Sequence, residues 1–301
     1  FEEFDLLASQ QGFIGSQVLP VMNVALQTAV FSKIKVKSLL TERNTLRAPG
    51  GGYSRQDWEF EQDSYATKEY GAEEVLDDRE RAIYAYTIDF ERIASMRAMD
   101  AVMRDYEKRV AAAVFNAAVF TPSPVTVEWS KTNSTPVQDV LTRVTTFKSQ
   151  MGMLPNALIF NDKVLRNLQV NEEIIDRLKY SGIDDPKKVT LQMLAALFNL
   201  QYIIVPNTMR NSANPGQTTP TFSDIWDDEY AMLCRVATSQ DLKEPCLGRT
   251  FHFTGDGSSL GGTVETYRHE PNRSDIMRVR HDVQEKILYT AAGLLMSNIT
   301  E

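Results

Sequence analysis

The residues that most often carry catalysis or bind metals are few in this chain, and they are scattered. The three histidines, His252, His269 and His281, form no metal-binding pair of the H-E-x-x-H kind. They fall on separate strand-like segments, where we expect surface or lightly buried side chains. The two cysteines, Cys234 and Cys246, are too few for a disulfide scaffold and lack metal-site spacing, so we expect both to be reduced. No local signature supports a Cys-His catalytic pair.

Two further stretches resemble binding sites. GDGSSLGG, residues 255–262, is rich in glycine but lacks the GK[ST] ending and the following helix of a phosphate-binding loop, so it predicts a hairpin turn. WDDEY, residues 226–230, places Asp227, Asp228 and Glu229 together, which could bind a cation or act as a carboxylate pair. Adjacent carboxylates before a strand are more often solvated. The sequence therefore predicts no catalytic residue, no cofactor and no metal, and a protein that is not an enzyme.

The composition describes a folded, acidic protein. The chain has 301 residues, 43% of them hydrophobic, which is enough for one large domain or two. Its net charge is −8 at pH 7 and its basic residues are dispersed, which argues against charge-driven binding of nucleic acid over the whole surface. No apolar run approaches the roughly 18 residues of a membrane span, and there is no signal segment. We expect a cytosolic protein without membrane contact.

The stretch 80–120 predicts one long amphipathic helix that the rest of the chain is organised around. Neither Gly nor Pro interrupts the chain between Gly71 and Pro122. A helix from about Asp89 to Phe120 would be roughly 45 Å long at 1.5 Å per residue. This length and a one-sided stripe favour a structural beam over the wall of a catalytic pocket. Apolar residues recur at three- and four-residue steps and would form the buried stripe: Ile93, Met96, Met99, Met103, Tyr106, Val110, Val114 and Ala117.

Ahead of the helix, the sequence predicts a long two-stranded ribbon. Phe31, Ile34 and Val36 alternate with lysines, and a second alternating run spans 53–65. Between them RAPGGGY, residues 47–53, has a proline and three glycines and predicts a flexible tip. A lone hairpin is at best marginally stable in water, so the ribbon needs a partner. The residues alone leave two alternatives equally open: a surface on another molecule, or a larger sheet in the same domain.

The second half of the chain predicts a compact α/β unit and a set of late strands. Thr135 would cap a helix that has Pro136 at its first position and Gly152 at its end. Short apolar strands then alternate with capped helices as far as Pro206, which indicates a sheet covered on its faces. A polar, turn-rich loop, 207–224, follows. After it come YAMLCRVAT, RTFHFT, TVETYRHE and IMRVRHDV, and finally KILYTAAGLLMSNI, an apolar strand that would return to the α/β unit.

In this order, the parts resemble the major capsid proteins of tailed bacteriophages, which have the Hong Kong 97-type fold. FIGSQVLPVMNV resembles the stretch that leads into that family's extended loop, and RAPGGGY with YATKEYGAEEVLDDRERA resembles the loop and its return. IDFERIASMRAMDAVMRDYEKRVAAAVFN resembles the spine helix, and PNALIFNDKVLRNLQVNEEIIDRLKY with LAALFNLQYIIVP resembles the axial domain. The resemblance covers most of the chain. It implies an α+β fold with a long spine helix, an extended β-hairpin loop and an α/β axial domain.

The resemblance also implies how the chain is divided. The parts would be an N-terminal arm (1–29), an extended loop (30–72), a peripheral domain with the spine helix (73–135 and 257–287) and an axial domain (136–256 and 288–301). The helix stripe would pack on the strands of 263–283. The extended loop would lie over a neighbouring subunit and contact it through Arg47, Pro49, Gly50, Gly51, Gly52, Tyr53, Arg55, Trp58 and Phe60. The polar loop would face the five- or six-fold axis, with Asn211, Asn214, Pro215 and Gly216 as candidate contacts.

The function implied is structural. Copies would assemble as pentamers and hexamers into an icosahedral shell that encloses double-stranded phage DNA and contacts it weakly. The expected partners are the protein itself, a scaffold, a portal and decoration proteins, and the expected place is the virion capsid, assembled in the host bacterial cytoplasm. No Lys and Asn pair for covalent crosslinking of subunits can be matched. One alternative is an encapsulin-like nanocompartment shell that encloses an enzyme cargo, and another is an enzyme that uses the carboxylates of WDDEY.

Overall fold

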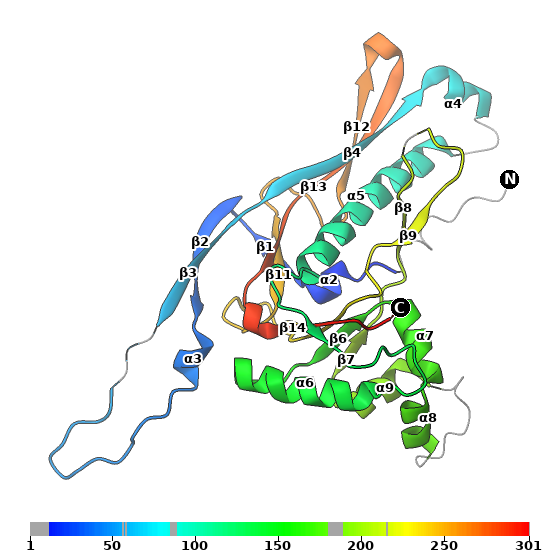
Figure 1. Cartoon of the computed structure of the whole chain (residues 1–301). Coiled ribbons are helices and arrows are strands. Elements are labelled where there is room, and N and C mark those ends of the chain that lie inside the picture. Colours follow the sequence, from blue (N-terminus) through cyan, green and yellow to red (C-terminus); the bar gives the residue numbers. More distant parts are fainter. Residues whose placement is uncertain are drawn as a thin grey trace.

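The described part of the chain folds into two five-stranded sheets with one long helix between them, two smaller two-stranded sheets, and a loop that projects beyond the body (Figure 1). The computed structural model describes residues 12–55, 57, 59–84, 89–179, 189–214 and 216–300. No helix in these ranges is both long and apolar enough to cross a bilayer.

The lower part of the molecule in Figure 1 is a five-stranded sheet. Its order is β5 (Ser123–Pro124), β14 (Gly293–Ser297), β10 (Ala231–Cys234), β6 (Ala157–Phe160) and β7 (Tyr202–Ile204). Four helices cover one face: α6 (Pro136–Met151), α7 (Asp162–Val170), α8 (Glu172–Lys179) and α9 (Leu191–Phe198). The final strand of the chain pairs antiparallel with β10, as predicted. Every residue of β6 and β10 is buried, because both faces of this sheet are covered.

The predicted ends of α6 are confirmed. Pro136 occupies the first turn, and Gly152 ends the helix in the left-handed conformation at φ 74°. Thr135 stands at the N-cap position, but its side chain accepts no capping hydrogen bond. On the next helices, the Asn161 side chain accepts from the backbone N–H of Lys163, and the Thr190 side chain from that of Met193.

The upper sheet contains β1 (Val21–Val24), β11 (Gly248–Phe253), β13 (Ser274–Ile287), β12 (Thr263–His269) and β4 (Lys68–Asp77). β13 is its central strand: it pairs with β4 along one side and with β12 and β11 along the other. The 3-10 turns η2 (Glu270–Asn272) and η3 (Thr290–Ala292) lie at the ends of this strand region. We assigned residues 248–253 to the axial part of the chain, yet their hydrogen bonds place them beside β13.

The predicted long helix is present as α5 (Phe90–Val114), with Asp89 as its N-cap. It packs under β13, as expected, and also under β4, and it is shorter than predicted. Tyr106, Val110 and Val114 of the predicted stripe are buried, whereas the first half of the helix buries a different face. In that half Ala94, Ala98 and Val102 are buried against the sheet, whereas the methionines we placed on the stripe are half-buried. Small side chains allow the helix to lie close to the sheet. Our prediction ranked residues by hydrophobicity and therefore placed larger side chains, the methionines, on the buried face.

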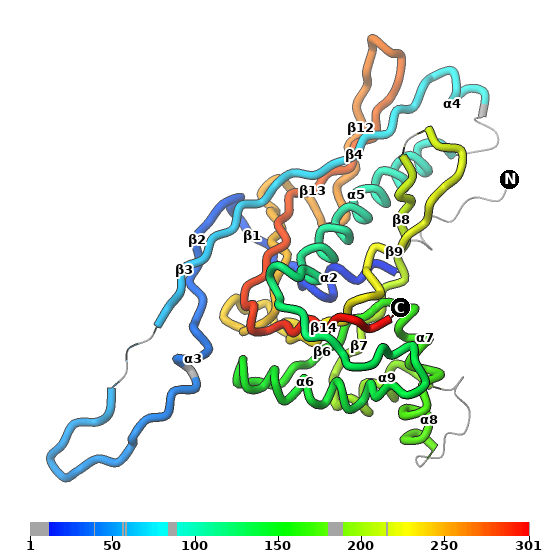
Figure 2. The backbone as a smooth tube through the Cα atoms, viewed as in Figure 1, coloured from blue at the N-terminus to red at the C-terminus, as the bar shows by residue number. Residues whose placement is uncertain are grey.

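The ribbon consists of β2 (Thr28–Ile34) and β3 (Phe60–Ala66), which pair antiparallel over seven residues. A short helix, α3 (Val36–Leu39), follows β2, so the predicted strand ends earlier than Val36. The tube in Figure 2 shows the chain continuing outward beyond the ladder as an open loop. The remaining short helices are α2 (Gly15–Val18), in the N-terminal arm, and α4 (Asp78–Tyr84), directly after β4.

The glycine-rich stretch 255–262 is not a hairpin turn, which corrects our prediction. It connects β11 to β12, which run in the same direction and pair one after the other along the same side of β13. Gly262 has a φ of 97° and packs so closely on Val279 that a Cβ would collide with it.

Candidate assembly surfaces

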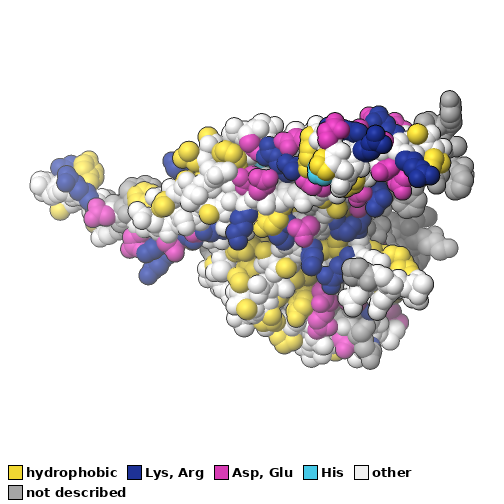
Figure 3. All heavy atoms as spheres, turned by 90° about the horizontal axis from the view of Figure 1, so that it is seen from above, with side chains coloured by type: hydrophobic (Ala, Val, Ile, Leu, Met, Phe, Trp, Pro, Cys, Tyr) yellow, Lys and Arg dark blue, Asp and Glu magenta, His cyan; other side chains and the backbone are white. Residues whose placement is uncertain are grey.

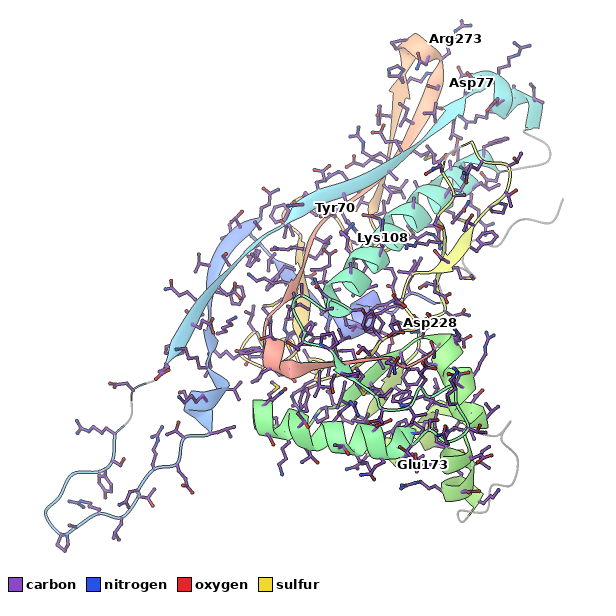
Figure 4. The ribbon with its side chains drawn as sticks, viewed as in Figure 1. Tyr70, Asp77, Lys108, Glu173, Asp228 and Arg273 are labelled. Carbon is purple, nitrogen blue, oxygen red and sulfur yellow. The ribbon has the colours of Figure 1, made fainter. Side chains whose placement is uncertain are left out.

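The histidines do not form a catalytic or metal site, but two of them are much more buried than predicted. His281 is fully buried on β13 between the rings of Tyr70 and Tyr106, each 6.2 Å away between centroids. Figure 4 shows Tyr70 on β4 above α5. Neither ring nitrogen of His281 has a hydrogen-bond partner among the described residues. Burial, together with the charge of Arg109, lowers the pKa of His281 to about 4. His252 is also buried, and burial lowers its pKa too.

The cysteines are free thiols, as predicted. Cys234 and Cys246 are both fully buried. Burial raises the pKa of Cys246 to about 11 and raises that of Cys234 further. Both thiols therefore stay protonated at neutral pH and lack the character of a nucleophile.

The carboxylates of WDDEY each make a structural contact instead of gathering around a cation. Asp228 accepts a hydrogen bond from Lys163 Nζ at 2.6 Å and another from Thr300 Oγ1 at 3.1 Å. Partial burial raises the pKa of Asp228, but these hydrogen bonds outweigh burial and hold the pKa below its ordinary value. Glu229 accepts from the backbone N–H of Asn298 at 2.8 Å. Among the described residues, no group of three or more His, Cys, Asp or Glu side chains could hold a metal.

Glu107 is a buried junction that our sequence analysis missed. It projects from α5 with no exposed surface and accepts three hydrogen bonds: from Ile14 N at 3.1 Å, Gly15 N at 2.7 Å and Trp226 Nε1 at 2.6 Å. Burial raises the pKa of this carboxyl, and the three donors oppose the rise. A Cβ at Gly15 would lie only 2.8 Å from Glu107 Oε2, so glycine is required for this approach. One side chain thus ties the N-terminal arm and the 226–230 segment to the spine of the molecule.

The base of the ribbon is anchored to the upper sheet. Phe31 and Tyr65 pack on Phe251, with Tyr65 stacked at 4.5 Å between ring centroids. Asp63 lies between Lys33, at 3.1 Å, and Lys286. Partial burial raises the pKa of Asp63, but the hydrogen bonds from the two lysines outweigh it, so the pKa falls below its ordinary value. The inner half of the ribbon is therefore joined to a sheet of its own chain. Of the two alternatives that the sequence left open, this half follows the second, a larger sheet in the same chain.

The tip of the loop forms a turn, and its flexibility stays a prediction. Gly51 N donates to Ala48 O at 2.9 Å across Pro49 and Gly50, and Gly50 has a φ of 78°, which is the geometry of a type II turn. Arg47 donates to Gly51 O at 2.6 Å, and its guanidinium lies 4.7 Å from the Tyr53 ring centroid.

The predicted loop contacts that fall within the described residues lie on this projecting segment or at its base. Phe60 and Tyr53 are exposed, at 57% and 74% of their surface, and so are Gly52 and Arg55. Trp58 lies outside the described residues. Leu40, directly after α3, packs at Gly152 at the end of α6, and beyond it the loop extends away from the body of the molecule (Figure 1). Whether a neighbouring subunit covers it stays a prediction.

The polar loop contains a small two-stranded hairpin of β8 (Met209–Asn211) and β9 (Phe222–Asp224). Asn211 Oδ1 accepts from the backbone N–H groups of Ala213 and Thr221, and Asn214 and Gly216 are exposed. Pro215 lies outside the described residues. The hairpin runs alongside α5, where Arg104 donates to Met209 O (Figure 2). An orientation toward a symmetry axis stays a prediction.

Charges on the outer face of the upper sheet are paired across strands. Glu73 on β4 lies 2.6 Å from Arg278 on β13, and Arg280 lies 2.8 Å from Glu265 on β12. Seen from above, basic and acidic side chains alternate over this face, whereas the tip of the loop shows basic and hydrophobic side chains (Figure 3). The arginines of the sheet face are thus neutralised locally.

The comparisons with known proteins agree with this architecture. The major capsid protein of Burkholderia phage BcepMu is 24% identical over 301 residues, and the match covers 95% of this chain and 91% of that protein. A phage-related protein from Bordetella bronchiseptica RB50 has a TM-score of 0.69 at 22% identity, with 96% of this chain and 93% of that chain covered. The capsid structure of cyanophage P-SCSP1u has a TM-score of 0.58 at 12% identity, with 93% and 86% covered. The chain has the Hong Kong 97-type capsid fold. This confirms the predicted α+β fold class, although no family model matches the sequence.

The Hong Kong 97-type capsid fold also occurs outside phage capsids. The holo-SrpI encapsulin complex from Synechococcus elongatus PCC 7942 has a TM-score of 0.54 at 10% identity, with 99% of this chain and 96% of that chain covered. At such identities the likeness shows the fold alone.

Proposed function

We propose that this chain is the major capsid protein of a tailed bacteriophage, and that many copies assemble as pentamers and hexamers into an icosahedral shell around double-stranded DNA. The observation that carries the proposal is the 24% identity to a phage major capsid protein over 95% of the chain. The Hong Kong 97-type capsid fold supports it independently of sequence. The role is structural, and we infer no reaction of its own.

The division into parts belongs to the same proposal. The arm (1–29), the extended loop (30–72), the peripheral domain (73–135 and 257–287) and the axial domain (136–256 and 288–301) would be the units that move and pack in a shell. The projecting loop supports a contact with a neighbouring subunit, because no hydrogen bond or ion pair joins residues 41–55 to the body of the chain among the described residues. For the loop 207–224 we keep the proposed position near a symmetry axis.

The proposed partners follow from a shell that is filled with DNA. The protein itself is the first partner, and a scaffold, a portal and decoration proteins are the others. Contact with DNA would be weak, because the chain carries a net charge of −8. The proposed place is the virion capsid, built in the cytoplasm of the host bacterium.

Electron microscopy of the purified protein tests this function. Shells or isolated capsomers are expected, with a scaffold added if one is needed. A strictly monomeric species that never assembles, even with its phage partners, would contradict the proposal.

The second candidate is an encapsulin-like compartment, which the likeness to the Synechococcus encapsulin favours. It predicts that particles purified from cells contain a cargo protein and no DNA. Mass spectrometry and nuclease treatment of the particle contents distinguish the two.

A further inference from the structure

The lower sheet has an open edge at β7. This strand stands at the end of the strand order, and of the described strands it pairs only with β6, parallel to it. On the β6 side, Tyr202 N donates to Asn156 O at 2.9 Å. Because alternate residues of a parallel strand face the same neighbour, the backbone N–H and C=O of Ile203 point to the open side. Such an edge can add another extended segment.

Two adjoining hollows follow this edge. The first, of about 490 Å³, lies between α9, β7 and the N-terminal arm, and none of its lining residues carries a charge. Leu191 and Tyr202 in its wall expose 39% and 48% of their surface. The second, of about 450 Å³, shares Gln201 and Thr238 with the first and contains Arg235. We call the two hollows together the edge groove.

Arg235 gives the second hollow a positive charge. Its Nη1 donates to Leu154 O at 3.2 Å, and its Nε is buried without a hydrogen-bond partner among the described residues. A guanidinium with unused donors binds a carboxylate well. The edge groove therefore fits an extended segment that brings apolar side chains to the first hollow and an acidic side chain to the second.

The first eleven residues of the chain have this composition. Residues 1–11, FEEFDLLASQQ, contain five apolar residues, three acidic residues and no basic residue. They lie outside the described residues. Their charge is opposite to that of the second hollow, and their apolar side chains suit the uncharged first hollow.

The described chain starts within reach of the groove. Gly12 packs so closely on Asn207 that a Cβ would lie 2.6 Å from Asn207 O, and Gln17 already lines the first hollow. Asn207 stands three residues after the end of β7. Asn207 and Gln201 are six residues apart, at most roughly 20 Å, whereas eleven extended residues span roughly 36 Å. Residues 1–11 can therefore cover the whole groove.

The order of the residues also matches the order of the hollows. If the residues before Gly12 run back alongside β7 one for one, Leu7 falls opposite Tyr202 and Asp5 opposite Leu200. Tyr202 lines the first hollow and Leu200 the second. Leucine side chains would thus meet the apolar hollow, and an aspartate would meet the hollow that contains a free guanidinium.

We infer that residues 1–11 dock in the edge groove of their own chain as an added strand beside β7, with Leu6 and Leu7 in the first hollow and Asp5 at Arg235. The segment is then a strap that keeps this edge from adding a strand of another molecule. The inference does not depend on the proposed shell function, because it concerns the single subunit.

The test is hydrogen exchange at the Ile203 amide in the unassembled full-length subunit. An amide that bonds to an added strand is protected, so exchange should be slow in wild type. Leu6→Asp with Leu7→Asp should speed exchange by about tenfold or more, because charged side chains would enter an apolar hollow. Leu46→Asp is the matched control: Leu46 is 88% exposed on the projecting loop, and its replacement should leave exchange at Ile203 unchanged.

A charge swap tests the second hollow. Arg235→Glu should speed exchange at Ile203 by about tenfold, because it places a carboxylate opposite the acidic segment. Adding Asp5→Arg should restore exchange to within about threefold of wild type. Circular dichroism of each variant checks that it is folded.

Three outcomes would overturn the inference. In the first, Ile203 exchanges as fast in wild type as in the leucine variant. In the second, Asp5→Arg does not rescue Arg235→Glu. In the third, protection of Ile203 in wild type falls when the subunit is diluted, which would assign the groove to a second copy instead of the same chain.

Discussion

Replacing His281 with Phe should make the free energy of unfolding of the subunit less sensitive to acid. The imidazole is fully buried between two tyrosine rings, and neither nitrogen has a hydrogen-bond partner among the described residues. An apolar ring of similar size therefore loses no hydrogen bond there. At pH 7.5 we expect the free energy of unfolding to change by less than about 1.5 kcal/mol.

The magnitude follows from the difference in pKa between the folded and unfolded chain. The ordinary pKa of histidine is 6.5, and burial lowers the pKa of His281 to about 4. A lowered pKa means that the folded state binds the proton less tightly, so this contribution to stability is complete above pH 6.5 and is lost as the pH falls toward 4. Between pH 7.5 and 5.0 the free energy of unfolding should fall by about 2 kcal/mol because of this side chain.

The assay is urea unfolding of the unassembled subunit at pH 7.5 and pH 5.0. The fall in free energy of unfolding between these values should be about 2 kcal/mol smaller for His281→Phe than for wild type. Tyr70→Phe is the control, because it keeps the aromatic contact and keeps His281, and it should show the wild-type fall. If His281→Phe and wild type lose the same free energy on acidification, the assignment of the acid sensitivity to this buried imidazole is wrong.

Four further substitutions test other parts of the structure. Glu107→Ala leaves three N–H donors buried without an acceptor and should lower the free energy of unfolding by about 3 to 5 kcal/mol, whereas Trp226→Phe, which removes one donor, should cost about 1 to 2 kcal/mol in the same urea assay. Ala98→Leu forces a larger side chain between α5 and β13 and should lower the melting temperature, with a cost of about 1 to 3 kcal/mol; an unchanged melting temperature would show that the helix can move away from the sheet. Gly50→Val strains the positive φ at the loop tip and should leave the subunit folded by circular dichroism while impairing assembly in electron micrographs; unimpaired assembly would argue against a role for the tip geometry.

The start of α5 and the ends of α6 could be predicted because local chemistry decides them. Asp89 caps the first turn, and Pro136 and Gly152 occupy positions that suit their backbone preferences. The end of α5 was predicted less accurately than its start. No Gly or Pro stands there, and the helix stops at Val114 shortly before Asn116, whose side chain accepts the backbone N–H of Ala118.

We missed the buried polar residues because we judged them by residue type and charge and did not use their position in the helix or strand period. His281 follows Met277 and Val279 at alternate positions on β13, so the strand period would have placed it against α5. Glu107 stands three, four and seven residues before Val110, Ala111 and Val114, on the buried face of the helix. A glutamate on a helix is usually solvated, and only the spatial neighbours Ile14, Gly15 and Trp226 make this one a junction.

Sheet partners at a distance were the least predictable part of the fold. The chain order suggested that β11 and β12 form a hairpin, but both run antiparallel to β13 and pair with it one after the other. Similarly, the sequence was consistent with two kinds of partner for the ribbon, another molecule or a larger sheet in the same domain, and gave no reason to prefer either. Its inner half packs on β11 through Phe251, and only its outer half is left for another molecule.

The continuous path from the loop into β4 has a mechanical consequence. β3 and β4 follow one another almost along one line, separated by Thr67 (Figure 1). A pull on the loop by a neighbour would therefore act along the axis of β4. The ladder hydrogen bonds between β4 and β13 lie across that axis, so such a force shears ten residue pairs together instead of opening them one after another. Load applied at the loop would therefore be distributed over the whole of β4 and would reach α5 through this sheet.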